Sequence, residues 1–80
     1  MIADTVLVKT VRGREEVRVR AHTLTALQRW LLILADGRRR VSDIAALLDC
    51  GVEDPSLQEA LECLHRDRYV DRLQDLERVA

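Results

Sequence analysis

The sequence predicts a small, mainly helical protein with a minor β component. Its 80 residues are enough for one domain and leave no room for a second. The chain has no Phe, and Trp30 and Tyr69 are its only aromatic residues, so the core must consist of aliphatic side chains. Such a composition favours packed helices, because Leu and Ala are strong helix formers. We expect a single domain over residues 1–80.

The N-terminal segment, residues 1–22, begins with a predicted strand that ends near Thr10, because its residues are apolar and β-branched. The stretch that follows fits either a hairpin turning at Gly13 or a short helix capped by Thr10. Two pairs of opposite charge at i,i+4 spacing favour the helix. Gly13 weakens that prediction, because glycine lowers helix stability.

The helical core, residues 24–73, begins with a predicted central helix. Thr25 and Gln28 have the spacing of a capping box at its start, and Gly37 supplies a stop signal. The residues between them are apolar nearly all round, which is typical of a buried helix.

Two residues of this central helix carry separate predictions. Trp30 lies among leucines on the helical wheel, so we expect it to be largely buried. Leu32 falls between the two polar positions of the helix. We expect the N-terminal segment to cover Leu32, and the alternative is that Leu32 contacts a partner at the surface.

The rest of the core is a loop and two further predicted helices. Residues 37–40 are expected to be a loop, and Ser42 to cap a helix over residues 41–51 that ends at Gly51. The apolar residues of that helix that should face inward are Ile44, Leu47 and Leu48.

The third helix of the core has the clearest pattern in the chain. Asp54 is its expected cap, and Pro55 takes the first helical position. Its apolar residues recur at 0, +3, +4 and +7 and should form the core face. They are Leu57, Ala60, Leu61 and Leu64.

The tail, residues 74–80, follows a short strand or turn at Tyr69 and Val70. Leu73, Leu76 and Val79 are spaced by three, so they would lie along one side of a short helix. Such a short helix must pack on something to form. The two alternatives are packing on its own domain and packing on a second copy, as in a homodimer.

The phrases "VSDIAALL" and "LQEALECLHRDRYV" resemble the winged helix-turn-helix superfamily over about residues 24–73. The resemblance implies a three-helix core. Two departures matter: Arg68 stands where the family usually has Gly, and about seven residues follow Leu73, so the wing should be truncated or missing. "DGRRRVSDIAALL" also resembles the peptide-binding, chaperone-type variants of this fold, which grip peptides through N-terminal strands and the adjacent helix.

Charge is divided between the two halves of the chain. Residues 1–40 hold nine Lys/Arg and four Asp/Glu, a net +5, and residues 41–80 hold four and ten, a net −6. The outward face of the third helix carries Glu59 and Glu62 against Arg66, which disfavours DNA, since proteins bind DNA mainly by bringing cations to its phosphates. These three residues are candidate contacts for a protein partner.

The strongest positive cluster is Arg38, Arg39 and Arg40. It is expected either to be solvated and paired with the acidic third helix, or to dock an acidic protein surface or a nucleic-acid backbone. Together with Leu32, these arginines complete the candidate partner-binding residues. No aromatic residue is interleaved with these arginines, which weakens the hypothesis that they bind single-stranded nucleic acid or RNA.

Chemistry is not expected. Cys50, Cys63 and His65 lack the pair spacing of a zinc site, and the chain has no nucleophile elbow or Gly-rich phosphate loop. We therefore expect no enzyme, no metal and no cofactor. With no secretory signal and no membrane-spanning run, the expected location is the cytoplasm and no membrane partner is expected. The predicted function is a non-catalytic module that binds a protein or peptide, and the alternative is a DNA-binding transcriptional regulator.

Overall fold

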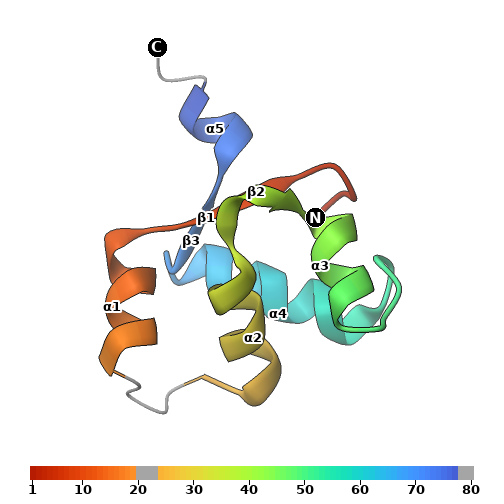
Figure 1. Cartoon of the computed structure of the whole chain (residues 1–80), viewed down its shortest axis with the longest axis horizontal. Coiled ribbons are helices and arrows are strands. Elements are labelled where there is room, and N and C mark those ends of the chain that lie inside the picture. The colour runs from red at the N-terminus through yellow and green to blue at the C-terminus, as the bar shows by residue number, and fades with distance from the viewer. Residues whose placement is uncertain (20–23, 78–80) are drawn as a thin grey trace.

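The computed structural model describes residues 1–19 and 24–77. Within them it has five helices and a three-stranded antiparallel sheet, which confirms a mainly helical protein with a small β component. In Figure 1, α2, α3 and α4 lie on one side of the sheet and α5 on the other. The elements in chain order are β1 (Val6–Lys9), α1 (Val11–Val19), α2 (Ala26–Leu34), β2 (Asp36–Arg40), α3 (Val41–Leu47), α4 (Pro55–Arg66), β3 (Val70–Arg72) and α5 (Leu73–Glu77).

The sheet has the order β2-β1-β3, so the predicted N-terminal strand is its central strand. Val8 of β1 pairs with Asp36 on one side and with Asp71 on the other. The prediction of a loop over residues 37–40 was wrong, because this stretch belongs to β2. It runs extended because it pairs with β1, a tertiary contact that local propensity does not reveal.

The segment after β1 forms the helix α1, as the charge pattern favoured. The hydroxyl of Thr10 accepts a hydrogen bond from the amide of Gly13 at 3.0 Å, which is the expected cap. A Cβ atom on Gly13 would stand 2.1 Å from the carbonyl oxygen of Tyr69 and 3.1 Å from Cδ1 of Leu32. Glycine is therefore needed for α1 to lie so close to the chain at Tyr69 and to α2.

Leu32 is fully buried, in contact range of α1. This confirms that the N-terminal segment covers Leu32. It also removes Leu32 from the candidate partner contacts, since no partner can reach a side chain without exposed surface.

The start of α2 follows the prediction and its end does not. The capping box of Thr25 and Gln28 is present, with both hydrogen bonds formed. The helix ends at Leu34 and not at Gly37, which lies inside β2 with a φ of 79°. The stop signal was thus assigned to the wrong residue.

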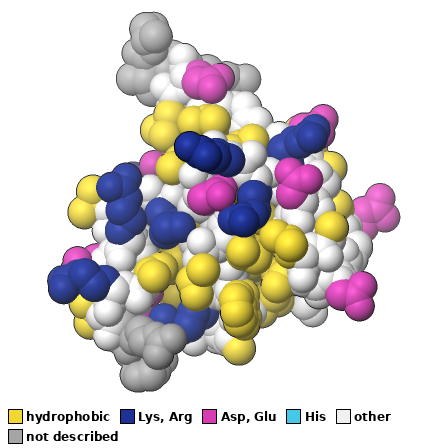
Figure 2. Space-filling view, viewed as in Figure 1, with side chains coloured by type: hydrophobic (Ala, Val, Ile, Leu, Met, Phe, Trp, Pro, Cys, Tyr) yellow, Lys and Arg dark blue, Asp and Glu magenta, His cyan; other side chains and the backbone are white. Residues whose placement is uncertain are grey.

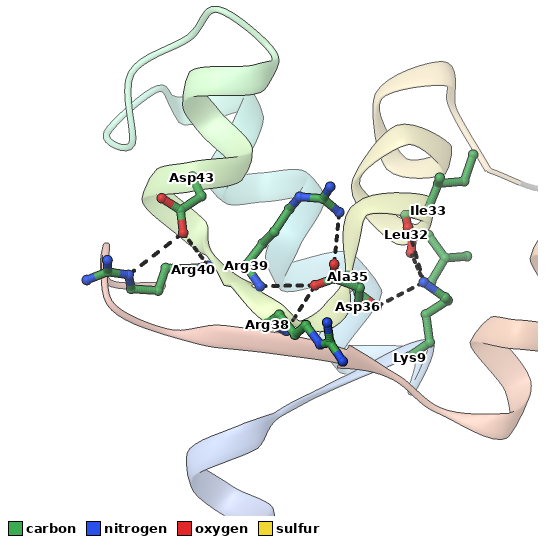
Figure 3. Close-up of polar contacts among 9 residues, drawn as sticks. All are labelled: Lys9, Leu32, Ile33, Ala35, Asp36, Arg38, Arg39, Arg40 and Asp43. Atoms are coloured by element: carbon green, nitrogen blue, oxygen red, sulfur yellow. Dashed lines mark hydrogen bonds and ion pairs between the residues drawn. The ribbon is translucent and has the colours of Figure 1, made fainter.

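A lysine from β1 closes the C-terminus of α2 instead. The Nζ atom of Lys9 donates to the carbonyl oxygens of Leu32, Ile33 and Ala35 at 3.2, 3.1 and 2.9 Å (Figure 3). The last carbonyls of a helix lack partners within the helix, and a cation is favourable there. Burial, the largest effect, lowers the pKa of Lys9 from its ordinary value.

The helix α3 starts and ends differently from the prediction. The carboxylate of Asp43 accepts a hydrogen bond from the amide of Arg40 at 3.0 Å, so Asp43 and not Ser42 satisfies the first backbone donor. The helix ends at Leu47, and Asp49 takes the left-handed backbone conformation (φ 55°) expected of a terminating glycine.

The helix α4 and the core follow the sequence pattern. The carboxylate of Asp54 accepts from the amides of Ser56 and Leu57 at 2.8 and 3.3 Å, and Pro55 occupies the first helical position. The four residues predicted for its core face are all buried. The buried apolar cluster is formed by Leu7, Leu31, Leu32, Ala35, Val41, Ile44, Ala45, Leu57, Ala60, Leu61, Leu64, Tyr69 and Val70.

The chain after α4 passes through one strand, β3, and then directly into α5. Gln74 ties α5 to the region of β1, because its side chain accepts from the amide of Val6 at 3.4 Å and donates to the carbonyl of Asp4 at 3.2 Å. In Figure 1, α5 projects beyond the sheet, at the end of the molecule opposite to α2.

Candidate functional site

The outer side of α2 is apolar and exposed. Trp30 is 56% exposed and Ile33 is 40% exposed, so the prediction that Trp30 is buried was wrong. The helix has only two polar residues, and the core receives its other side, where Leu31 and Leu32 are fully buried. A small domain buries a smaller fraction of its surface than a large one, and here the core covers only one side of α2.

Exposed apolar surface continues from α2 toward α3. Leu47, which was predicted to face inward, is 60% exposed at the end of α3. Figure 2 shows apolar side chains gathered over α2 and between α2 and α3. We call the α2–α3 face the apolar surface that carries the exposed Trp30 and Ile33 with the half-buried Leu27 and Leu34, and that Figure 2 shows extending between α2 and α3. Contiguous exposed apolar patches mark sites of interaction.

The three predicted arginines lie on β2, between the two helices of this face (Figure 3). Nη1 of Arg39 lies 2.9 Å from a carboxylate oxygen of Asp36, and Nε of Arg40 lies 3.7 Å from one of Asp43. In Figure 3 the side chain of Arg39 rises between α2 and α3.

Asp36 and Asp43 each lie three residues along the sequence from the arginine that they contact. A third, Asp4, lies 3.6 Å from Nη1 of Arg40. None of these acids belongs to α4, so the expected pairing of the arginines with the acidic helix is not seen among the described residues. The third arginine, Arg38, is exposed, and its side chain extends over β1 in Figure 3.

Carboxylates also accept hydrogen bonds from three backbone amides of β2. The amides of Arg38 and Arg39 donate to Asp36 at 2.9 and 3.0 Å, and the amide of Arg40 donates to Asp43. These backbone bonds are the main reason that the pKa of Asp36 lies below its ordinary value. An added strand needs free backbone groups at a sheet edge. These three amides of β2 are already used, and β1 is paired on both sides.

The surroundings of the α2–α3 face are basic. Figure 2 shows Lys and Arg side chains over β1, β2 and α1 beside the apolar patch. Described residues 6–40 hold eight Lys/Arg and three Asp/Glu, a net +5, whereas residues 41–66 hold one and six, a net −5. On α1, the guanidinium of Arg12 stacks 4.7 Å from the ring centroid of Tyr69.

The other predicted contacts, Glu59, Glu62 and Arg66, are exposed on α4. Glu62 lies 3.3 Å from the amino group of Met1, and Nε of Arg66 lies 3.5 Å from Asp67. The structure does not bring these three side chains to β2. Glu59 and Glu62 form an acidic surface on α4, separate from the arginines of β2.

The described residues include side chains of the kinds that bind metal ions, among them two thiols. No three His, Cys, Asp or Glu side chains among them are grouped to hold a metal ion. Both cysteines are free thiols, and burial raises the pKa of Cys50, which makes it a poor nucleophile. None of the helices described is long and apolar enough to cross a membrane.

The tail offers a second exposed apolar position. Leu73 is half-buried at the start of α5, and Leu76 is 47% exposed. Val79, the third residue of the predicted set, lies outside the described residues. Leu76 stands among acids, because Asp75 and Glu77 flank it in the sequence.

Two features of the site were missed from the sequence: the exposed Trp30 and the strand β2. A signal for the first was present, since α2 has no polar side wide enough to face water. The comparisons with known proteins add no assignment. No family model matches the chain, and no curated protein and no solved structure matches it either.

Proposed function

We propose that this chain is a non-catalytic binding domain that docks a protein partner on the α2–α3 face. The observation that carries the proposal is the 56% exposure of Trp30, the chain's one Trp, on a helix whose other side is buried. Tryptophan is enriched among residues that dominate binding energy at protein interfaces. Covering Trp30 with a partner would remove a large apolar area from water, which is favourable by about 25 cal/mol per Å² of area buried.

The partner's chemistry follows from the charge around the face. The apolar patch is bordered by β2 and α1, which carry an excess of arginine. A matching surface presents apolar side chains at its centre and carboxylates at its edge, since complementary charge favours encounter and orientation. A basic partner would be repelled.

The mode of binding is contact between side chains. Strand addition at β2, a mode like that which the resemblance to peptide-binding variants implies, is disfavoured because the amides of Arg38, Arg39 and Arg40 are already bonded to carboxylates. A helix or an ordered loop that lies across Trp30 and Ile33 fits the surface better.

We place this face on a winged-helix-like scaffold with an altered wing. In that proposal α2, α3 and α4 are the three core helices, and β3 follows α4 as a first wing strand would. The position beside β3, where a second wing strand would pair, is taken by β1 from the N-terminal segment. The acidic outer side of α4, with Glu59 and Glu62 exposed, favours a protein partner over DNA.

Capture experiments with matched variants test the proposed function. The chain is used as bait at moderate salt, after nuclease treatment of the lysate, and compared with Trp30→Glu and with Val11→Gln. Val11 is 81% exposed on α1, so its replacement by neutral Gln controls for the loss of an exposed apolar side chain without adding an acid to the basic border. We expect captured protein to be lost with Trp30→Glu and kept with Val11→Gln.

Two results would contradict the proposal. One is capture that Trp30→Glu leaves unchanged, which places the binding surface elsewhere. The other is tight, salt-dependent binding of random duplex DNA by the parent chain, measured by fluorescence anisotropy, which favours the DNA-binding alternative.

A further inference from the structure

The helix α5 has the chemistry that the α2–α3 face requires of a partner. None of its residues is buried, and Leu76 is 47% exposed. Residues 71–77 hold three acids and one arginine, a net −2. That single cation, Arg72, is bonded through Nε to Asp75 at 2.7 Å, so Glu77 and Asp71 give the segment its negative surface.

This segment is held in place with its apolar side chain outward. Gln74 fixes α5 to the region of β1 through hydrogen bonds with Val6 and Asp4. A helix of five residues gains too little from its own backbone to be stable alone, so an uncovered Leu76 leaves it only partly supported. A covering surface would stabilise it.

The α2–α3 face of the same molecule cannot provide that cover. Figure 1 places α5 and α2 at opposite ends of the molecule, on opposite sides of the sheet. Contact between the two is therefore available only between copies.

We propose that α5 of one copy docks on the α2–α3 face of a second copy, with Leu76 against Trp30 and Ile33, so that the chain associates head to tail. This inference rests on the proposed function of the face. The acids of α5 then lie beside the arginines of β2 and α1 of the neighbour. The alternative symmetric dimer, with face against face, would bring two basic borders together, which complementary charge disfavours.

Head-to-tail contact has two physical consequences. The two contacting surfaces differ, so each added copy of the chain leaves one α2–α3 face and one α5 free at the ends of the assembly. The assembly therefore grows as an open chain, or closes into a ring when its two ends meet. The contact area of a short helix is small, so the association is weak and sensitive to salt. Mass should rise with concentration and fall when salt is added.

Complementation between two variants tests the head-to-tail arrangement. Trp30→Glu disables the face and leaves α5 intact, and Leu76→Glu disables α5 and leaves the face intact. Sedimentation velocity over a range of concentrations should show that each variant alone associates at least about 30-fold more weakly than the parent, as expected for an interface hot spot. A mixture of the two should form a dimer of one copy of each and nothing larger.

Controls keep the test decisive. Ile33→Glu serves as a second variant of the face, and Val11→Gln, which changes an exposed apolar side chain without adding an acid to α1, should associate like the parent. Circular dichroism melting of each variant checks that it is folded, and both Trp30 and Leu76 are exposed enough for this to be expected.

Three outcomes would overturn the inference. These are a parent that stays monomeric at millimolar concentration, association that Leu76→Glu leaves intact, and a mixture that fails to recover the dimer. If partner capture from lysate still depends on Trp30 in any of these cases, the inference fails while the proposed function stands.

Discussion

The helices α2 and α4 are both rich in leucine, yet they relate to the core in different ways. In α4 the apolar residues form one stripe, and all four of them are buried while Glu59 and Glu62 face water. In α2 the apolar residues surround the helix, and the structure buries one side and leaves Trp30 and Ile33 exposed. An apolar stripe on one side determines which side of a helix faces the core. A helix that is apolar all round carries no such signal.

The difference shows where a small protein has apolar residues beyond the needs of its core. The core is closed by α4, β1, α3 and one side of α2, and little volume remains for the other side of α2. Large apolar side chains that stay mostly in water add little to the stability of the isolated fold. Their exposure on α2 supports the docking role proposed above.

The largest expected effect tests this difference directly. Leu61→Ala on α4 should lower the free energy of unfolding by about 2–5 kcal/mol, because it leaves a cavity in the core. Trp30→Ala on α2 should lower it by less than about 1 kcal/mol, although it removes more atoms, because more than half of the side chain is already in water. Urea denaturation of both variants measures the two values. Equal losses would mean that Trp30 supports the core.

Local signals were the part of the fold that the sequence could predict. The Thr25–Gln28 capping box, the Asp54 cap with Pro55, and the stripe of α4 all depend on residues within one or two helical turns. The strand β2 could not be predicted in this way. Its "DGRRR" sequence has low strand propensity, and it is extended because residues as distant as Val6 pair with it.

The candidate site was predictable as a set of charges and not as a surface. Arg38, Arg39 and Arg40 were identified from their clustering, but their contacts with Asp36 and Asp43 depend on the backbone path through β2 and the start of α3. Trp30 was misplaced because the same apolar pattern suits burial and docking alike. Only the arrangement of the other helices decides between them.

A change of intermediate size concerns the side of α2 that faces α1. Gly13→Ala improves intrinsic helix propensity by up to about 1 kcal/mol. The new Cβ, however, would stand 2.1 Å from the carbonyl oxygen of Tyr69. Because that oxygen belongs to the backbone, no side-chain rotation can relieve the clash. We expect a net loss of about 1–3 kcal/mol, typical of overpacking, as α1 moves away and uncovers Leu32.

Thermal unfolding of Gly13→Ala can be compared with Arg14→Ala, which changes an exposed neighbour on the same helix. The second variant should stay close to the parent. A Gly13→Ala chain as stable as the parent would show that α1 can shift without loss, and that the covered side of α2 is held less firmly than the contacts indicate.

The smallest expected effect concerns the chain that follows α2. The carboxylate of Asp36 accepts hydrogen bonds from two amides of β2 and from Arg39, and these bonds hold its pKa below the ordinary value. A group whose pKa is lower in the folded state stabilises the fold above its unfolded pKa of about 3.9 and loses that contribution as pH falls through the folded pKa. Stability should therefore decline below about pH 4 partly because of this residue. Asp36→Asn should reduce the difference between the urea midpoints measured at pH 6 and pH 3. The control is Glu59→Gln, which removes an exposed carboxylate from α4 and leaves β2 unchanged. If Asp36→Asn keeps the full acid dependence of the parent, the bonds to Arg38 and Arg39 do not hold β2 in place, and the strand depends on its pairing with β1 alone.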